Sequence, residues 1–320
     1  MPELPDITVY IDALRPRVIG RVLAAARIKS AFLVRTFEPS VDSLIGSRVL
    51  GVERLGKRIV FEFQGERFLV LHLMIAGRLL WKPPGTRPGG KIDLATFEFE
   101  SQHAADEAFA PGGTLLLTEA GTTKRASIHV LAGRDELRAH DPGGIDPLTC
   151  SYAEFVAAVQ SENRTLKRLL TSPSLVSGIG NAYSDEILHA AKLSPVKLSR
   201  SLDAEQLRRL HEAMRRLLNE WTGRLKREFG LVSEGAPGKF PKTGQITAFR
   251  PDFAVHGKFG KACPVCGTTV QRIVRAENEV NYCPGCQTNG KLLADRSLSR
   301  LLKDDWPETA AEWEEERRAK

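Results

Sequence analysis

The sequence predicts a multidomain α+β protein: an N-terminal helix plus β-sandwich, then a helical segment, then a small cysteine-rich hairpin. Three observations lead to this expectation. Short β-branched and aromatic runs fill the first half, helical periodicity replaces them after residues 141–147, and two Cys-x-x-Cys pairs follow near the end. The chain has 320 residues, of which 42% are hydrophobic and 27% charged, so it can bury more than one core.

The first half reads as one helix followed by strands. Over residues 6–18, the residues Ile7, Ile11 and Leu14 fall on a single helical face. Five later runs have strand character and are separated by turn residues: 58–63, 67–73, 94–100, 114–118 and 127–131. This order of one helix followed by strands predicts a helix packed on a twisted sandwich of strands.

The second half reads as helical. Helices are expected at 152–160, 163–170, 181–191 and 204–227. The last has an apolar stripe from Leu207 to Leu225, and Asp203 can cap it with Gln206 three residues on. Residues 230–260 are rich in glycine, proline and basic residues, which is typical of a loop and linker.

The charge balance is basic. Lys and Arg number 46 against 39 Asp and Glu, a net charge of +7 at pH 7. This excess favours a polyanionic partner such as nucleic acid, although it would also serve solubility alone. No run approaches ~18 apolar residues, and the N-terminus lacks a basic start followed by an apolar block. We therefore expect an intracellular protein with no membrane span and no secretory signal.

Four cysteines have the spacing of a metal site. Cys263 and Cys266 form one Cys-x-x-Cys pair, and Cys283 and Cys286 form the other. Two such turns joined by a β-hairpin place four thiolates tetrahedrally, which suits one structural Zn²⁺ ion. A redox dithiol and surplus core thiols are the alternatives. Cys150 lies outside the pattern and reads as an ordinary buried thiol.

The extreme N-terminus carries a second chemical signal. Removal of Met1 would expose the imino group of Pro2, with Glu3 beside it. An α-amino group has a reference pKa of ~8 against ~10.4 for lysine, so it is more often neutral and nucleophilic at pH 7. A secondary amine that attacks a sugar C1′ gives a cationic iminium, which is an electron sink for elimination. Because many proteins begin Met-Pro, this motif depends on its context.

A glycine turn is the third signal. Gly178 and Gly180 form a tight turn before Asn181 and a helix. Backbone N–H groups at a helix N-terminus make a phosphate site, although a lone Gly-x-Gly turn is weak evidence of one.

Six motifs occur together in one order along the chain. They are Met1–Asp6, Lys57 within Gly56–Arg58, His72-Leu73, Gly77, the turn Val176–Glu186, and the Cys₄ finger ending in Gln287. In this combination the chain resembles the formamidopyrimidine-DNA glycosylase / endonuclease VIII family of base-excision repair enzymes over residues 1–290.

The resemblance implies a domain order. A catalytic β-sandwich domain would span 2–133 and a helix-two-turn-helix DNA-binding domain 145–232. A flexible linker at 233–252, a zinc finger at 253–288 and a C-terminal extension at 289–320 would follow, with DNA in the cleft between the lobes.

Site residues follow position by position from the resemblance. Pro2 would be the Schiff-base nucleophile, Glu3 the proton-transfer residue and Lys57 the general acid assisting β-elimination. For Lys57, a surface lysine opening a strand is the alternative. The resemblance further implies DNA contacts at Arg125, Lys167, Asn181 and Lys258, and void-filling side chains at Met74 and Ile75, because a flipped nucleotide leaves a hole in the duplex.

Some positions depart from the family pattern. Ile75, with Met74 beside it, stands where the family has a void-filling methionine, and Ala126 where it has an aromatic wedge. Asn278 stands where the family has a hairpin arginine, and Thr8 where it has a glutamate. Arg272 and Arg275 are candidate substitutes for the hairpin arginine. These departures bear on lesion preference and δ-elimination and leave the Pro2 chemistry intact.

The resulting hypothesis is a bifunctional DNA glycosylase/AP lyase, with oxidised purines as the default substrate. Its partner would be damaged double-stranded DNA, and we expect a cytoplasmic or nucleoid-associated monomer. A catalytically silent lesion-binding protein of the same fold is the first alternative, and a zinc-ribbon transcription or translation factor is the second.

Overall fold

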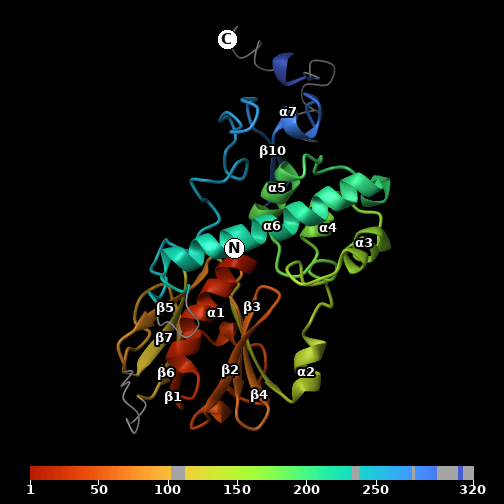
Figure 1. The fold of residues 1–320 in the computed structure, drawn as a ribbon. Coiled ribbons are helices and arrows are strands. Elements are labelled where there is room, and N and C mark those ends of the chain that lie inside the picture. The colour runs from red at the N-terminus through yellow and green to blue at the C-terminus, as the bar shows by residue number, and fades with distance from the viewer. Residues whose placement is uncertain (102–111, 233–237, 276–277, 294–308, 313–320) are drawn as a thin grey trace. The chain divides into compact units, whose positions relative to one another are not determined.

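The chain forms two compact units in the computed structural model, which describes residues 1–101, 112–232, 238–275, 278–293 and 309–312 (Figure 1). Unit 1 comprises residues 1–142 and 219–248, and unit 2 comprises residues 143–218 and 249–320. Most of the extension expected at 289–320, and residues 233–237 of the expected linker, lie outside the described residues.

Unit 1 begins with helix α1 (Leu4–Val18). Its first turn is closed by a hydrogen bond from the Glu3 N–H to Asp6 Oδ2, 2.9 Å long. Ile7, Ile11 and Leu14 are buried, as their spacing predicted. The helix therefore presents one apolar face to the strands and holds residues 2 and 3 at the edge of the core.

Two four-stranded antiparallel sheets follow, and both are visible in Figure 1. One has the order β1-β6-β7-β5, and the other the order β2-β3-β4-β8. Their bounds are β1 (Leu23–Ile28), β2 (Val49–Leu55), β3 (Arg58–Phe63), β4 (Arg67–His72), β5 (Gly77–Lys82), β6 (Asp93–Phe99), β7 (Gly113–Glu119) and β8 (Ser127–Ala132).

The five predicted strands are confirmed, whereas β1, β2 and β5 were not predicted. β1 is mostly half-buried and contains three consecutive alanines, and a glycine and charged residues interrupt β2. Such segments have weak intrinsic strand signals. Their pairing with neighbouring strands decides their conformation.

The core of unit 1 lies between the sheets and under α1. It contains Leu14, Phe61 and Phe97, and it also takes in Leu225 and Phe229 from the C-terminal end of helix α6 (Ala204–Glu228). On the outer face of the second sheet, helix α2 (Arg134–Ala139) packs over a smaller apolar cluster. Short 3₁₀ turns, η1 (Ala31–Leu33) and η2 (Val41–Leu44), join β1 to β2.

Unit 2 is mainly helical and contains a two-stranded hairpin late in the chain. Its elements are α3 (Tyr152–Ser161), α4 (Leu166–Leu170), α5 (Asn181–Ala190), η3 (Ser199–Ser201), the first part of α6, β9 (Gln271–Arg275), β10 (Asn278–Tyr282) and α7 (Pro284–Gln287). The predicted cap of α6 is confirmed, because Asp203 Oδ1 accepts the Gln206 N–H at 2.8 Å. Helix α4 begins later than the expected residue 163, because Thr165 bridges Leu198 in extended conformation.

No helix within the described ranges combines the length and the apolar character that a membrane crossing requires.

Candidate functional site

The amino terminus of unit 1 is held among charged side chains. Pro2 and Glu3 are buried immediately ahead of α1. Burial lowers the pKa of the Met1 amino group below its ordinary value of 8.0. The negative charge of Glu3 opposes this shift, while the positive charges of Arg78 and Lys57 add to it. The start of the chain is therefore surrounded by two acids near it in the sequence, Glu3 and Asp6, and by two bases far from it in the sequence, Arg78 and Lys57.

Lys57 lies at the tip of a tight hairpin. Leu55 pairs with Arg58, so Gly56 and Lys57 alone join β2 to β3. Gly56 has φ +62°, which a two-residue hairpin turn requires and glycine adopts without strain. Lys57 is half-buried, and burial lowers the pKa of its ammonium while the nearby Glu3 partly restores it. Lys57 therefore loses its proton more readily than a surface lysine.

His72 ends β4 directly opposite Arg58. Burial, followed by the positive charges of Arg58, Lys57 and His129, lowers its pKa to about 4. The imidazole is consequently neutral at pH 7 and can donate or accept a hydrogen bond beside Lys57.

The two void-filling candidates lie in the turn between β4 and β5. Met74 adopts a left-handed backbone with φ +51°, an uncommon and strained conformation for a non-glycine residue. Ile75 is at the tip and 50% exposed. Gly77 closes the turn by donating its N–H to the Leu73 carbonyl at 2.9 Å, and a Cβ on Gly77 would lie 2.2 Å from that oxygen. The turn thus requires glycine at residue 77 and presents Ile75 outward.

Arg125 is held by its backbone and exposes its side chain. Its N–H donates to the carboxylate of Glu119, with both oxygens at 3.0 Å, and the Ala126 N–H donates to the same carboxylate at 3.1 Å. Ala126 is only 3% exposed. Glu119 is buried at the end of β7. It was not identified from the sequence, because it accepts these hydrogen bonds only once the chain has folded back at residues 120–124.

Arg78 is another residue that sequence reasoning missed. Its Nε donates to the Ile246 carbonyl at 2.8 Å, and its Nη1 donates to the Gly77 carbonyl at 2.7 Å. The only sequence signal was its place directly after Gly77. Its approach to the amino terminus depends on how β5 lies beside the start of the chain.

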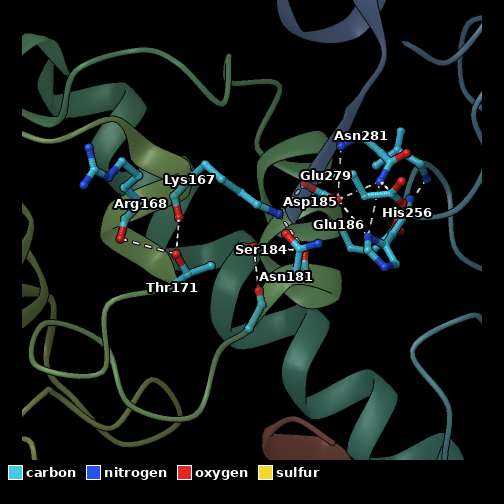
Figure 2. Close-up of polar contacts among 12 residues, drawn as sticks. Lys167, Arg168, Thr171, Asn181, Ser184, Asp185, Glu186, His256, Glu279 and Asn281 are labelled. Carbon is cyan, nitrogen blue, oxygen red and sulfur yellow. Dashed lines mark hydrogen bonds and ion pairs between the residues drawn. The ribbon is translucent and has the colours of Figure 1, made fainter. Parts of the chain in front are cut away.

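In unit 2, Lys167 and Asn181 come together, as Figure 2 shows. The Lys167 Nζ donates to the Asn181 carbonyl at 2.6 Å and lies 2.5 Å from Asp185 Oδ1. Lys167 is only 8% exposed. Its charge is therefore matched by a carboxylate within the protein, a relation that its position in the sequence does not reveal.

Asp185 and Glu186 then join α5 to the segment before the finger (Figure 2). Asp185 Oδ2 lies 2.8 Å from His256 Nδ1 and accepts the Asn281 N–H at 3.2 Å. Glu186 accepts three backbone N–H groups, those of residues 254, 255 and 256, at 2.8–2.9 Å. Burial raises the pKa of Glu186, and these three donors oppose that shift.

Lys258 follows this segment and is half-buried. Its Nζ donates to the Pro251 carbonyl at 2.7 Å, so the ammonium bridges the loop formed by residues 251–258. Its neighbour Gly257 has φ +68°.

The four finger cysteines converge on one point. Cys263 Sγ lies 3.9 Å from Cys286 Sγ, and Cys266 Sγ lies 3.3 Å from Cys283 Sγ. Four sulfurs at ~2.3 Å from a tetrahedral Zn²⁺ would be about 3.8 Å apart, so the donor set fits zinc. Backbone N–H groups of Val265 and Cys286 point at the sulfurs of Cys263 and Cys283 at 3.4 Å each, a favourable arrangement for thiolates.

Glycine is required within the second pair of cysteines. A Cβ at Gly285 would lie 2.5 Å from Thr268 Oγ1 and 3.0 Å from Cys266 Sγ. The sequence Cys-Pro-Gly-Cys therefore lets the two turns approach closely enough to share one ion.

The finger hairpin neutralises part of its own charge. Arg272 lies 3.7 Å from Glu279 and stacks over Phe259, with its guanidinium carbon 4.6 Å from the ring centre. The side chains of Asn278 and Arg275 lie outside the part of the chain that the structure describes. Of the two arginines considered as substitutes for the family's hairpin arginine, only Arg272 has a side chain that the structure describes.

Three family models match the chain in the order of its elements. The formamidopyrimidine-DNA glycosylase N-terminal domain matches residues 1–109, and the formamidopyrimidine-DNA glycosylase H2TH domain matches residues 144–224. The zinc finger found in FPG and IleRS matches residues 260–289. An N-terminal helix with a β-sandwich, a helix-two-turn-helix segment and a zinc finger define a multidomain protein of DNA-glycosylase type.

Similar proteins of known family identify the family of this chain. Formamidopyrimidine-DNA glycosylase of Thermus thermophilus is 30% identical over 91% of this chain and 100% of its own length. A Mycobacterium tuberculosis chain named an uncharacterized formamidopyrimidine-DNA glycosylase-like protein is 39% identical over 54% of this chain and all of its own. The chain belongs to the formamidopyrimidine-DNA glycosylase family.

Solved structures agree with this fold. Lactococcus lactis Fpg in complex with abasic-site DNA has a TM-score of 0.71 and 25% identity, covering 89% of this chain and 99% of that one. The same protein with DNA containing an oxidised pyrimidine has a TM-score of 0.71 and 26% identity, covering 90% and 100%. The predicted fold class and family are confirmed, and the predicted zinc site is supported by the matched finger and by a cluster of Cys263, Cys283 and Cys286 with His189.

Proposed function

We propose that this protein is a bifunctional DNA glycosylase and AP lyase that excises oxidised bases, purines first, from double-stranded DNA. The observation that carries the proposal is the amino terminus of unit 1. Burial lowers the pKa of the Met1 amine there, and Glu3 and Lys57 act on it electrostatically. Removal of Met1 would expose the Pro2 nitrogen next to the same groups, and an amine beside a proton carrier and a partly buried lysine suits Schiff-base chemistry.

The reaction starts after removal of Met1. The lone pair of the Pro2 nitrogen attacks C1′ of a flipped nucleotide, and the C1′–N bond breaks as the base leaves with a proton. Glu3 exchanges protons with the opening sugar. The resulting iminium draws electrons from the C2′–H bond, and loss of that proton expels the 3′ phosphate. Water then releases Pro2 from the cleaved product.

Lys57 is proposed as the general acid of the elimination. A lowered pKa suits this role, because an ammonium with a lower pKa gives up its proton more readily than an ordinary lysine does. His72 is neutral beside it and does not add a competing positive charge at pH 7.

The remaining parts would bind and position the DNA. Arg125, Lys167, Asn181 and Lys258 are proposed contacts, and Met74 and Ile75 are proposed to fill the space of the extruded nucleotide. One structural Zn²⁺ bound by the four finger cysteines would hold the hairpin. We propose that the protein works as a monomer in the cytoplasm or on the nucleoid.

Borohydride trapping tests the proposal. Wild-type protein incubated with an abasic-site duplex and borohydride should give one covalent adduct, because reduction fixes the iminium. Mass spectrometry should locate the adduct on a Met1-free N-terminal peptide. Pro2→Gly should lose most of the adduct while keeping its zinc and its unfolding temperature. An undiminished adduct in Pro2→Gly, or active protein that retains Met1, would refute Pro2 as nucleophile.

A second candidate function is lesion binding without turnover. Two observations favour it: Ala126 is buried where the family resemblance expects a wedge, and the Lys167 charge is matched by Asp185. This candidate expects tight binding to the abasic duplex and no trapped adduct with wild-type protein. Single-lesion duplexes, with 8-oxoguanine and thymine glycol first, would then identify the substrate of an active enzyme.

A further inference from the structure

A histidine outside the four-cysteine pattern reaches the metal site. His189 lies in the last turn of α5 and is 6% exposed. Its Nε2 is 3.3 Å from Cys263 Sγ. The donor atoms of His189, Cys263, Cys283 and Cys286 all lie within 4.8 Å of one another. The family-model match to the zinc finger covers residues 260–289, so this residue comes from a different part of the chain.

The geometry fits a hydrogen-bond donor better than a metal ligand. Cys266 Sγ lies 3.3 Å from Cys283 Sγ, which keeps the fourth thiol within the donor set. Four thiolates around Zn²⁺ leave two negative charges in excess, so N–H groups aimed at the sulfurs stabilise the site. The Cys263 sulfur accepts one hydrogen bond from the Val265 N–H, and the His189 ring nitrogen lies where it can donate a second.

The same helix makes two further connections to the finger segment. Asp185, Glu186 and His189 lie within five consecutive residues of α5, and positions 185 and 189 share one helical face. Asp185 contacts His256 and Asn281, and Glu186 accepts the backbone N–H groups of residues 254–256 (Figure 2). Helix α5 is thereby joined to the metal-bearing segment at three positions.

We propose that His189 donates its Nε2–H to the zinc-bound Cys263 thiolate, making α5 a structural part of the metal site. The assignment concerns metal retention and does not depend on glycosylase activity. Loss of the donor removes a charge-stabilising contact from one thiolate, so the bound metal should be released more easily. Outer hydrogen bonds of this kind change metal affinity by about 10–100-fold.

Zinc competition measures the effect. Full-length zinc-loaded protein is titrated with a chromogenic chelator, comparing wild type, His189→Phe and His189→Gln. Phenylalanine keeps an aromatic ring but has no N–H, and we expect about 10–100-fold weaker zinc binding. Glutamine keeps a donor and should recover part of the loss. His211→Phe is the matched control, because His211 is another buried histidine of unit 2 and packs against Phe155.

Nitrogen NMR on the wild type provides an independent readout that needs no variant. With ¹⁵N-labelled histidine and zinc replaced by ¹¹³Cd, the Nε2 of His189 should carry a proton and show no one-bond coupling to the metal. A Cd–N coupling would overturn the proposal and make His189 a ligand. Equal zinc affinity for wild type and His189→Phe would also overturn it. If His189→Phe does not fold, the zinc affinity of His189→Gln and the wild-type spectrum still distinguish a hydrogen-bond donor from a metal ligand.

Discussion

Lys167 Nζ lies 2.5 Å from Asp185 Oδ1, and both side chains are buried. The Asp185 carboxylate also lies 2.8 Å from His256. This one acid therefore compensates a buried lysine on α4 and joins α5 to the segment that leads into the finger.

The Asp185→Asn variant should be strongly destabilised. Removing one partner of a buried ion pair leaves an uncompensated charge, which costs about 3–5 kcal/mol. Chemical denaturation of full-length protein measures the change. Glu205→Gln is the matched control, since Glu205 and Arg209 form an exposed pair in the same unit, and its loss should stay below about 1 kcal/mol. Equal effects of the two changes would contradict the buried compensation.

The Lys57 pKa should respond to Glu3. Burial lowers it and the Glu3 charge raises it, so Glu3→Gln should lower the Lys57 pKa further. Because an acid catalyst must be protonated, the rate of elimination should fall as pH rises through this pKa. NMR titration of the Lys57 side chain, assigned with Lys57→Arg, measures the shift. Glu98→Gln, whose carboxylate pairs with Arg27, should leave the titration unchanged.

His72 should make stability depend on pH in the acidic range. Its folded pKa is about 4 against 6.5 for the ordinary group, so the unfolded chain binds more protons between these values. Stability is therefore lost as pH falls from about 6.5 to about 4, by at most ~3 kcal/mol. The free energy of unfolding, measured by denaturation at several pH values in this range, should depend less on pH for His72→Gln than for wild type. An equal pH dependence in the two proteins would show that His72 is not its source.

Gly77→Ala should disrupt the turn that presents Ile75. The new Cβ would lie 2.2 Å from the Leu73 carbonyl oxygen, so the backbone must move. We expect a loss of about 1–3 kcal/mol or more in stability, measured by thermal unfolding. Gly89→Ala is the control, because a methyl group there would meet no described atom within 4 Å beyond its chain neighbours, and its φ is not positive. A stability equal to wild type would mean that the turn tolerates the side chain.

Much of the fold could be predicted from local pattern. The face of α1 formed by Ile7, Ile11 and Leu14, the cap of α6 at Asp203 and the five patterned strands are properties of neighbouring residues. The same is true of the cysteine spacing, since Cys-x-x-Cys turns determine which sulfurs can meet. The family resemblance rested on six short motifs, the cysteine finger among them, and on their order, and it is confirmed.

Tertiary structure decided which residues meet across the sequence. Glu119 turns back to the Arg125 backbone, Asp185 pairs with Lys167, and His189 reaches Cys263 across 74 residues. No local pattern encodes such contacts, because they depend on how separate elements pack. By itself the sequence determined most of the element types, the metal-binding spacing and the family, since these follow from short-range periodicity and motif order, whereas β1, β2 and β5 were not predicted. Only the folded chain decided the charge environment of Lys57 and the partners of the buried ions, because burial and long-range Coulomb interactions exist only after packing.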